Sequence, residues 1–301
     1  MRPLRLGTRG SALARVQTAI VAEALRALGA GLVLEVVVIT TSGDRLVGRI
    51  PIETASPPDS VKGLFTKEIE EALLRGEVDL GVHSLKDLPS TETPGLCIAA
   101  VPARGDPRDV VISRDGVPLG GLSAGGRVGT GSARRDVLVR EARPDLVVEP
   151  IRGNVDTRLR KLAAGQVDAL VLAAAGLIRL GREGEITEWL PPERFVPAPG
   201  QGALAIQIRA DDDRVAQIIE RLDDASTRTA VETERLFADR VGGGCRLPVG
   251  AYAEQRNGRL TLTGMVYDGR PIRVAVTGEA DEGERLASEA AGMARASGTG
   301  R

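Results

Sequence analysis

An internal repeat of two short patterns is the feature that most limits how this chain can fold. "GTRGSALARV" from Gly7 resembles "GTGSARRDVL" from Gly129, and in both a strand-like run passes through Gly and Ser into a helical pattern. "RGEVDLGV" from Arg75 likewise resembles "AGQVDALV" from Ala164. The pairs recur in the same order but at unequal separations, unlike the fixed period of a solenoid. The repeat therefore predicts two similar α/β lobes, one with a longer loop.

Strand and helix patterns alternate along the first lobe. We predict strands at 4–8, 32–40 and 78–82, and helices at about 11–28 and 65–76. The run at 32–40 is almost continuously apolar and β-branched, which is typical of a strand buried on both faces. Residues 41–63 are polar and rich in Pro, and they predict a mobile functional loop.

The rest of the chain divides into a second lobe and a smaller C-terminal part. The strand "ALAIQIR" at 203–209 is expected to cross back to the first lobe, and two helical stretches and a hairpin-like alternation follow from about 223. The predicted fold class is α/β, with two similar lobes like those of periplasmic binding proteins, mixed sheets, and a small α+β domain. The predicted domains are 1–101 with 202–222, 102–201, and 223–301.

Composition excludes several classes of protein. The 40 basic residues nearly balance the 41 acidic ones, and only 2% of residues are aromatic, so a nucleic-acid interface with stacking platforms has little support. No run approaches the roughly 18 apolar residues of a membrane span. Two cysteines allow at most one disulfide. We therefore expect a cytoplasmic protein with free thiols, no metal, and no nucleic-acid or membrane partner.

Arginines recur where predicted strands lead into helices. Ser11 and Ser132 are predicted helix caps, and the unpaired amides of a helix N-terminus favour anions. The neighbouring arginines are Arg9, Arg134, Arg135, Arg152, Arg158 and Arg179. Each alone fits a solvated surface residue, and base composition can explain the excess of Arg over Lys. Their placement at the ligand side of such sheets nevertheless predicts an anion with several carboxylates or phosphates.

Two segments carry unusual reactive groups. "GVHSLKDLPS" from Gly81 contains the only His of the chain, followed by Lys and Asp, directly after an apolar run. Asp87 alone could simply cap the turn before Pro89. Cys245 lies in "VGGGCRLPVG", where glycines leave the thiol unshielded, so it suggests an attachment point or nucleophile. The apolar segment "LCIAA" predicts that Cys97 is a small residue of the core.

These segments resemble the signatures of the porphobilinogen deaminase (hydroxymethylbilane synthase) family, in the family's order and from end to end. The matching segments are "TRGSALA", "GLFTKEIE", "VHSLKDLP", "DPRDV", "GTGSARR", "IRGNVDTRLRKL", "AGLIRLG", "PAPGQGALAIQIR" and "GGGCRLPVG". The resemblance implies a transferase of porphyrin, tetrapyrrole and haem biosynthesis, expected to be monomeric. Such an enzyme condenses four porphobilinogens head to tail into 1-hydroxymethylbilane and releases ammonia at each addition.

The resemblance also implies site residues and a cofactor. A dipyrromethane primer is expected to be joined by a thioether to Cys245, and Asp87 matches the catalytic aspartate, which stabilises positive charge on pyrrole nitrogens and takes part in proton transfer. The implied cofactor-binding residues are Lys86, Ser84, Thr130, Ser132, Arg134, Arg135, Arg152, Gly153 and Asp44. The implied substrate-binding residues are Arg9, Ser11, Arg158, Arg179, Phe65 and Lys62. His83 is expected to have a packing or hydrogen-bonding role.

A different class of protein shares part of this pattern. A two-lobed module that binds an anionic ligand without catalysis would have the same lobes and the same arginines. It would not need Asp87 or a thiol flanked by glycines, so these two residues separate the two hypotheses.

Overall fold

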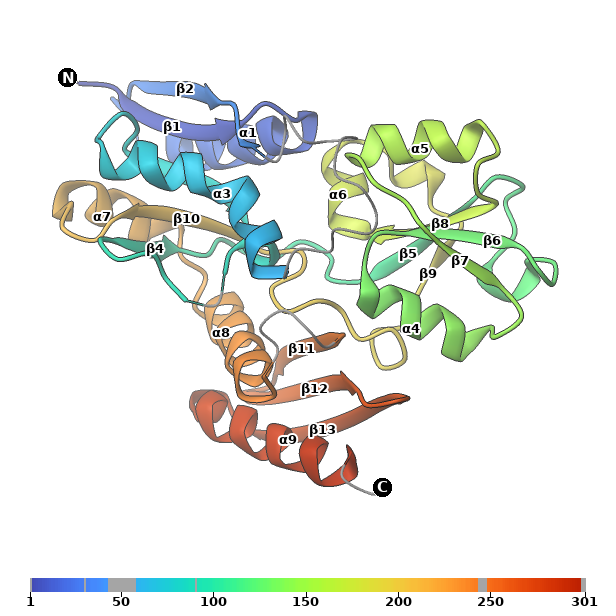
Figure 1. Cartoon of the computed structure of the whole chain (residues 1–301). Helices are drawn as coiled ribbons and strands as arrows, with labels where there is room; N and C mark the ends of the chain where they lie inside the picture. The colour runs from blue at the N-terminus through green and yellow to red at the C-terminus, as the bar shows by residue number, and fades with distance from the viewer. Residues whose placement is uncertain (1, 30, 43–57, 90, 243–247, 299–301) are drawn as a thin grey trace. The chain divides into compact units, whose positions relative to one another are not determined.

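The computed structural model describes residues 2–29, 31–42, 58–89, 91–242 and 248–298, and within 58–65 it describes the helix but not the side chains. The chain forms two compact units (Figure 1). Unit 1 comprises residues 1–105 and 203–228, and unit 2 comprises 106–202 and 229–301. The predicted division into three domains stays a prediction.

Unit 1 is built around a mixed five-stranded sheet. Its strands, in spatial order, are β2 (Leu34–Ile39), β1 (Leu4–Arg9), β3 (Leu80–Ser84), β10 (Leu204–Arg209) and β4 (Leu96–Ala100). The first three are parallel, whereas β10 runs antiparallel to β3 and β4. The strand expected to cross back at 203–209 therefore does so, and it lies inside this sheet, between β3 and β4.

Unit 2 repeats the same arrangement. Its five-stranded sheet has the order β7 (Val147–Pro150), β6 (Arg127–Thr130), β8 (Ala169–Ala173), β5 (Asp109–Ser113) and β9 (Glu188–Trp189). Here β5 is the antiparallel strand in the fourth place of the sheet, the position that β10 has in unit 1. Even one capping contact recurs, because Asp79 Oδ2 accepts from Arg5 N and Asp168 Oδ2 accepts from Arg127 N, both at 2.8 Å. The predicted pair of similar α/β lobes with mixed sheets is confirmed.

Helices cover both faces of each sheet. In unit 1, apolar residues of α1 (Ala12–Ala27) and α7 (Asp213–Ile219) form one core, and those of α3 (Pro58–Leu74) form another. In unit 2, α4 (Ala133–Ala142) contributes to one core, and α5 (Val155–Ala163) and α6 (Ala174–Arg179) contribute to the other. Ser11 and Ser132 cap α1 and α4, as predicted.

Two predictions for unit 1 were wrong. Strand β2 is not buried on both faces, since Val36 and Val38 are 46% and 45% exposed. The strand lies at the edge of the sheet, where the face that carries Val36 and Val38 is covered only in part, although Leu34 on that face still packs against the core. In addition, residues 58–63 of the expected loop belong to α3. A Pro at the first helical position is compatible with the helix, because that residue needs no amide donor. Residues 43–57 lie outside the described part.

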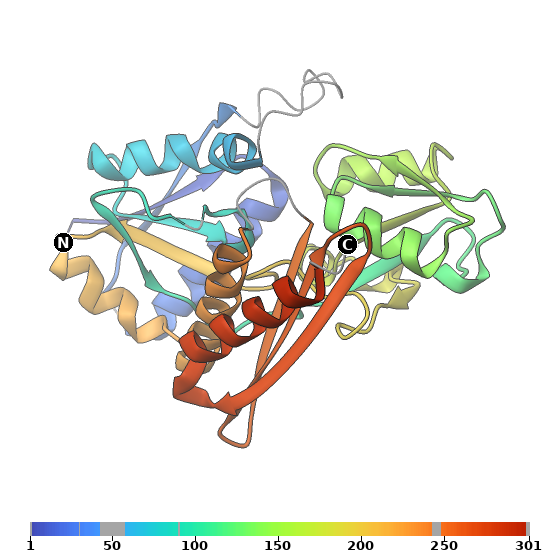
Figure 2. The same ribbon diagram turned by 60° about the horizontal axis from the view of Figure 1, so that its bottom comes forward.

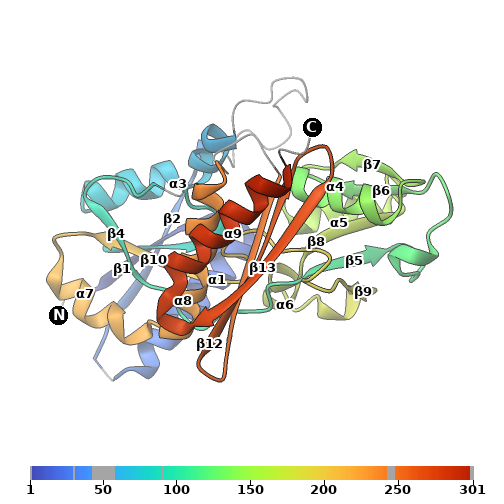
Figure 3. The same ribbon diagram turned by 90° about the horizontal axis from the view of Figure 1, so that it is seen from below.

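The C-terminal part is a small α+β arrangement, which confirms the last element of the predicted fold class. Strands β11 (Val249–Arg256), β12 (Arg259–Tyr267) and β13 (Pro271–Glu279) form an antiparallel sheet in that order. Figures 2 and 3 show α9 (Gly283–Gly298) lying across this sheet. The fully buried Phe237 of α8 (Ala225–Arg240) fills the space above Gly264, where a Cβ would lie 2.4 Å from the ring.

Candidate active site

The carboxyl ends of β1 and β3 bring five of the predicted residues to one edge of the sheet in unit 1. Strand β1 ends at Arg9 and strand β3 ends at Ser84, and a single 3₁₀ turn, Leu85–Asp87, follows β3. Because the strands are parallel neighbours, their ends share the edge at which α/β sheets bind ligands. The five residues are Arg9, Ser11, Ser84, Lys86 and Asp87.

The turn that carries Asp87 is fixed by hydrogen bonds on both sides. Leu85 N donates to Ala203 O at 3.0 Å, and Leu88 N donates to Leu85 O at 3.1 Å. Leu85 is also buried, which anchors the turn in the core. Asp87 is only half-buried, so its carboxylate is attached to a rigid turn yet remains accessible.

Gln17 is a residue that the sequence analysis missed. It lies on α1 and is 4% exposed, and its Nε2 donates to Ser84 Oγ at 2.8 Å. The bond joins the helix that Ser11 caps to the start of the turn that carries Asp87. A signal was present in the sequence, because Gln17 is a polar residue on the apolar face formed by Val21 and Leu25.

His83 points into the core of unit 1. It is 5% exposed, and burial lowers its pKa to about 4; the charge of Arg9 acts in the same direction, whereas the nearby polar side chain of Gln207 acts in the opposite one. Gln207 Nε2 in turn donates to Glu70 Oε1 at 3.1 Å. The imidazole is therefore neutral at pH 7 and belongs to the buried polar packing under β3, as expected from the sequence.

Because the chain has a single His, its titration can be measured directly. With a pKa of about 4 in the folded state and 6.5 as the ordinary value, the unfolded state binds the proton first. Stability from the neutral imidazole is complete above pH 6.5 and is lost as pH falls toward 4, by up to about 3 kcal/mol. We expect the one imidazole NMR signal to titrate near 4, and His83→Asn to flatten the pH dependence of unfolding in that window. Titration near 6.5 would contradict the buried placement.

In unit 2, a second group of predicted residues meets where β6 and β7 end. Ile151 N donates to Thr130 O at 3.1 Å, which holds the two strand ends together, and Ser132 N donates to Thr130 Oγ1 at 3.2 Å. Gly131 leaves no room for a side chain, because a Cβ there would lie 2.8 Å from Ile151 O. The backbone therefore turns tightly into α4, whose N-terminal amides favour an anion.

Arg158 reaches the same corner from α5. Its Nε donates to Gly153 O at 2.8 Å, and its Nη2 lies 3.6 Å from the position of a Cβ on Gly131. Gly153 has a φ of 116°, which favours glycine. Arg152 precedes it and is exposed. Thr130, Ser132, Arg152, Gly153 and Arg158 thus form one cationic corner at the starts of α4 and α5.

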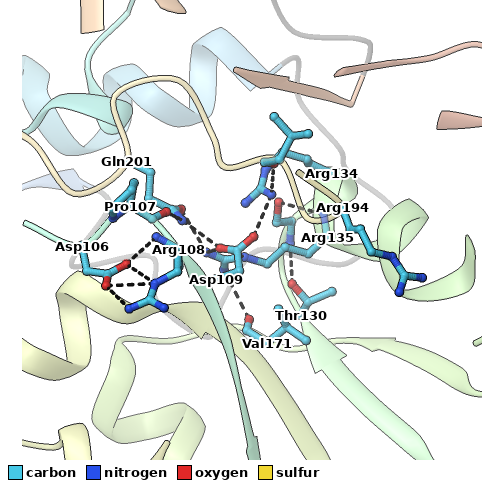
Figure 4. Close-up of polar contacts among 12 residues, drawn as sticks. Asp106, Pro107, Arg108, Asp109, Thr130, Arg134, Arg135, Val171, Arg194 and Gln201 are labelled. Carbon is cyan, nitrogen blue, oxygen red and sulfur yellow. Dashed lines mark hydrogen bonds and ion pairs between the residues drawn. The ribbon is translucent and has the colours of Figure 1, made fainter. Parts of the chain in front are cut away.

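Arg134 and Arg135 are buried rather than solvated. Both are bound to Asp109, the first residue of β5, which is 0% exposed (Figure 4). Burial alone would raise the pKa of Asp109, but the charges and hydrogen bonds of the two arginines hold it far below its ordinary value. The sequence analysis missed Asp109, although a charged residue at the start of the apolar strand "DVVIS" was a signal for a buried ion pair.

Of the other predicted site residues, the structure describes the side chain of Arg179. Arg179 ends α6, and its Nη2 donates to Gly202 O at 2.6 Å, while burial lowers its pKa. Asp44 and Cys245 lie outside the described residues, as do the side chains of Lys62 and Phe65. The two groups of site residues belong to different units, and the geometry above holds within each unit.

Within the described ranges, no helix is long and apolar enough to cross a membrane. In the same ranges, no cluster of at least three His, Cys, Asp or Glu side chains has a geometry suited to a metal ion.

Comparison with known proteins identifies the family. The family model described as "Porphobilinogen deaminase, dipyromethane cofactor binding domain" matches residues 4–217, and "Porphobilinogen deaminase, C-terminal domain" matches 228–295. The porphobilinogen deaminase of Roseiflexus castenholzii is 49% identical over 95% of this chain and 93% of that protein. That of Syntrophus aciditrophicus is 47% identical over 96% and 94%, respectively.

Among solved structures, the methionine-binding protein MetQ matches 73% of this chain and 89% of its own, with 13% identity and a TM-score of 0.47. A nutrient-binding protein from Burkholderia cenocepacia bound to methionine matches 80% and 98%, with 13% identity and a TM-score of 0.45. The sequence matches are far closer and extend over nearly the whole length. The chain belongs to the porphobilinogen deaminase family.

Proposed function

We propose that this protein joins four porphobilinogens head to tail on a dipyrromethane primer, releases ammonia at each addition, and finally releases 1-hydroxymethylbilane. The observation that carries the proposal is the identity of 47% to 49%, over more than nine-tenths of both chains, to relatives named porphobilinogen deaminase. The alternative, an anion-binding module without catalysis, is not favoured, because the relatives that match this chain over nearly its whole length are named porphobilinogen deaminase.

Asp87 is proposed to act on the pyrrole nitrogens. Its carboxylate is half-buried on a rigid turn, so it can accept hydrogen bonds from N–H groups and stabilise the positive charge that develops on them. The same carboxylate can hold a proton removed from the ring. Gln17 and the Leu85 amide restrict where the turn lies, so this charge is in position before the substrate binds.

The arginines are proposed to bind the acetate and propionate groups that every pyrrole unit carries. Arg9 and Ser11 offer such a site in unit 1, and Arg152 and Arg158 offer one in unit 2. Guanidinium groups suit these ligands because they donate paired hydrogen bonds to a carboxylate. Arg179, Lys62 and Phe65 are proposed as further substrate contacts.

The described residues of unit 2 fit an anionic cofactor. Arg134 Nε is buried and has no hydrogen-bond acceptor among the described residues, so it can donate to a carboxylate oxygen of such a cofactor. Ser132, Thr130, Arg135, Arg152 and Gly153 are proposed to hold the cofactor with it, together with Ser84, Lys86 and Asp44. The primer, when bound, supplies the carbon nucleophile on which the chain is begun.

We further propose that Cys245 carries the primer through a thioether and that the enzyme is a cytoplasmic monomer without a nucleic-acid or membrane partner. The support for Cys245 is its setting between glycines and an Arg in "GGGCRLP". Cys97 is a poor candidate, because burial raises the pKa of its thiol and so disfavours the thiolate. The transferase activity itself is tested by incubating the purified protein with porphobilinogen and measuring ammonia and 1-hydroxymethylbilane.

Two arginine variants distinguish specific anion binding from a general effect of charge. Arg152→Leu is expected to raise the KM for porphobilinogen, or to lower the rate of chain extension, by about tenfold or more. The reason is that a substrate or cofactor carboxylate loses its guanidinium partner. The matched control is Arg256→Leu, since Arg256 is exposed and paired with Glu254 at 2.8 Å on the C-terminal sheet. Steady-state kinetics of both variants decides the question. Equal effects would contradict a specific role for Arg152.

A further inference from the structure

Asp109 divides its two oxygens between two consecutive arginines. Oδ2 accepts from Arg134 Nη1 at 2.7 Å, and Oδ1 accepts from Arg135 Nε at 3.0 Å and from Nη2 at 2.8 Å. Figure 4 shows both guanidinium groups turned toward this single carboxylate. Among the residues that the structure describes, Asp109 is thus the charged partner that the two arginines share.

A shared partner is needed because of where the arginines lie on the helix. Consecutive helical residues point about 100° apart around the axis, so Arg134 and Arg135 diverge at the first turn of α4. Their other acceptors are accordingly different, Val196 O for Arg134 and Val171 O for Arg135. The carboxylate of Asp109 on β5 accepts from both side chains and so holds them at one point.

Gln201 fixes the carboxylate from another side. Its Nε2 donates to Asp109 Oδ1 at 2.8 Å and to Pro107 O at 2.7 Å, and its Oε1 accepts from Arg135 Nη2 at 3.2 Å. Because the amide nitrogen donates to two partners and the amide oxygen accepts from a third, only one orientation of the side chain satisfies all three. The cluster of Asp109, Arg134, Arg135 and Gln201 is therefore ordered before any ligand arrives.

The charges of this cluster do not cancel. Two guanidinium groups and one carboxylate leave a net charge of +1. The side chains of Arg134 and Arg135 are 5% and 7% exposed, and that of Asp109 is 0% exposed. An uncompensated buried charge is costly, and the neighbouring Asp106 and Arg108 neutralise each other. The orphan Nε of Arg134 belongs to the same cluster. Both observations indicate that one anionic group completes it.

We infer that Asp109 is a positioning residue: it holds Arg134 and Arg135 together so that they receive one carboxylate of the cofactor. The inference rests on the proposed function. It differs from a simple effect of charge, and the two predict opposite signs. Removing the negative charge of Asp109 raises the local charge to +2, which would strengthen attraction of an anion. Loss of positioning instead weakens binding.

The test compares Asp109→Asn with a matched control, Asp79→Asn. Asp79 is also buried, at 1% exposed, and is bound by Arg5 through Nε and Nη2 at 3.1 and 2.9 Å, but it lies outside the proposed site. Both variants are expected to melt at lower temperature. Only Asp109→Asn is expected to change the cofactor. Either the fraction of protein that carries the additional mass of two pyrrole units falls by about tenfold, or cofactor-free protein regains that mass from porphobilinogen about tenfold more slowly.

Two results would overturn the inference. One is an Asp109→Asn protein with wild-type cofactor content, restoration rate and KM; the other is an equal loss of cofactor in both variants. If Asp109→Asn does not fold, Gln201→Leu decides, because it removes the support of Asp109 without changing any charge, and the same loss of cofactor is expected. Wild-type protein that carries no pyrrole mass would contradict the proposed function itself, which separates the two failures.

Discussion

Asp87→Asn is expected to keep the fold and the attached cofactor but to lose at least about a hundredfold in kcat. The substitution preserves the size of the side chain and changes only its charge and one hydrogen-bonding atom. An amide cannot stabilise developing positive charge as a carboxylate does, and removing one such electrostatic contact typically costs 10²–10³ in rate. Single-turnover and steady-state measurements on the purified variant, with its cofactor content determined by mass, separate chemistry from binding.

Asp115→Asn is the appropriate control for this variant. Asp115 is 71% exposed in its side chain and forms a long ion pair with Arg114 at 3.6 Å, so its loss should leave kcat unchanged. An Asp87→Asn enzyme that turns over near the wild-type rate would remove Asp87 from the mechanism. The turn Leu85–Asp87 would then be a structural cap only.

Cys245→Ala is expected to abolish both the covalent cofactor and the activity. A thiolate can form a thioether with the electron-poor form of the substrate, and Ala offers no atom for that bond. Without the cofactor, the buried positive charge around Arg134 stays uncompensated, so the variant should also melt below the wild-type protein. Intact mass, activity and a thermal melt on the same preparation measure the three effects.

Cys97→Ala provides the matched control. Cys97 is half-buried on β4, and its substitution should remove only a small packing contribution while cofactor and turnover persist. An active Cys245→Ala enzyme would exclude the covalent attachment at this position. Loss of the cofactor in the Cys97 variant instead would move the attachment to β4.

Much of the fold could be predicted because its signals are local. Ser11 and Ser132 precede helices in the repeated pattern, and both cap them. The strand before Asp87 was recognisable from its apolar run, although it extends to Ser84, beyond the predicted end at residue 82. The repeat in the sequence also predicted two similar lobes, and the two sheets indeed share one arrangement of strands.

The predictions that failed, and the features that were missed, depend on neighbours distant in sequence. An apolar run does not tell whether a strand lies at the centre or the edge of a sheet, so the exposure of Val36 and Val38 was not foreseen. The burial of Arg134 and Arg135 depends on Asp109, 25 and 26 residues earlier in the chain. Gln201, which completes that cluster, is still further away, 92 residues from Asp109.

Intact-mass spectrometry of the purified protein, before and shortly after addition of porphobilinogen, tests the central claim most directly. We predict a mass above that of the sequence by two pyrrole units, followed by a series of equal steps, each corresponding to one substrate less ammonia. Such a series arises only if the chain grows on the protein. The mass of the bare sequence, unchanged by porphobilinogen in a correctly folded preparation, would contradict the account.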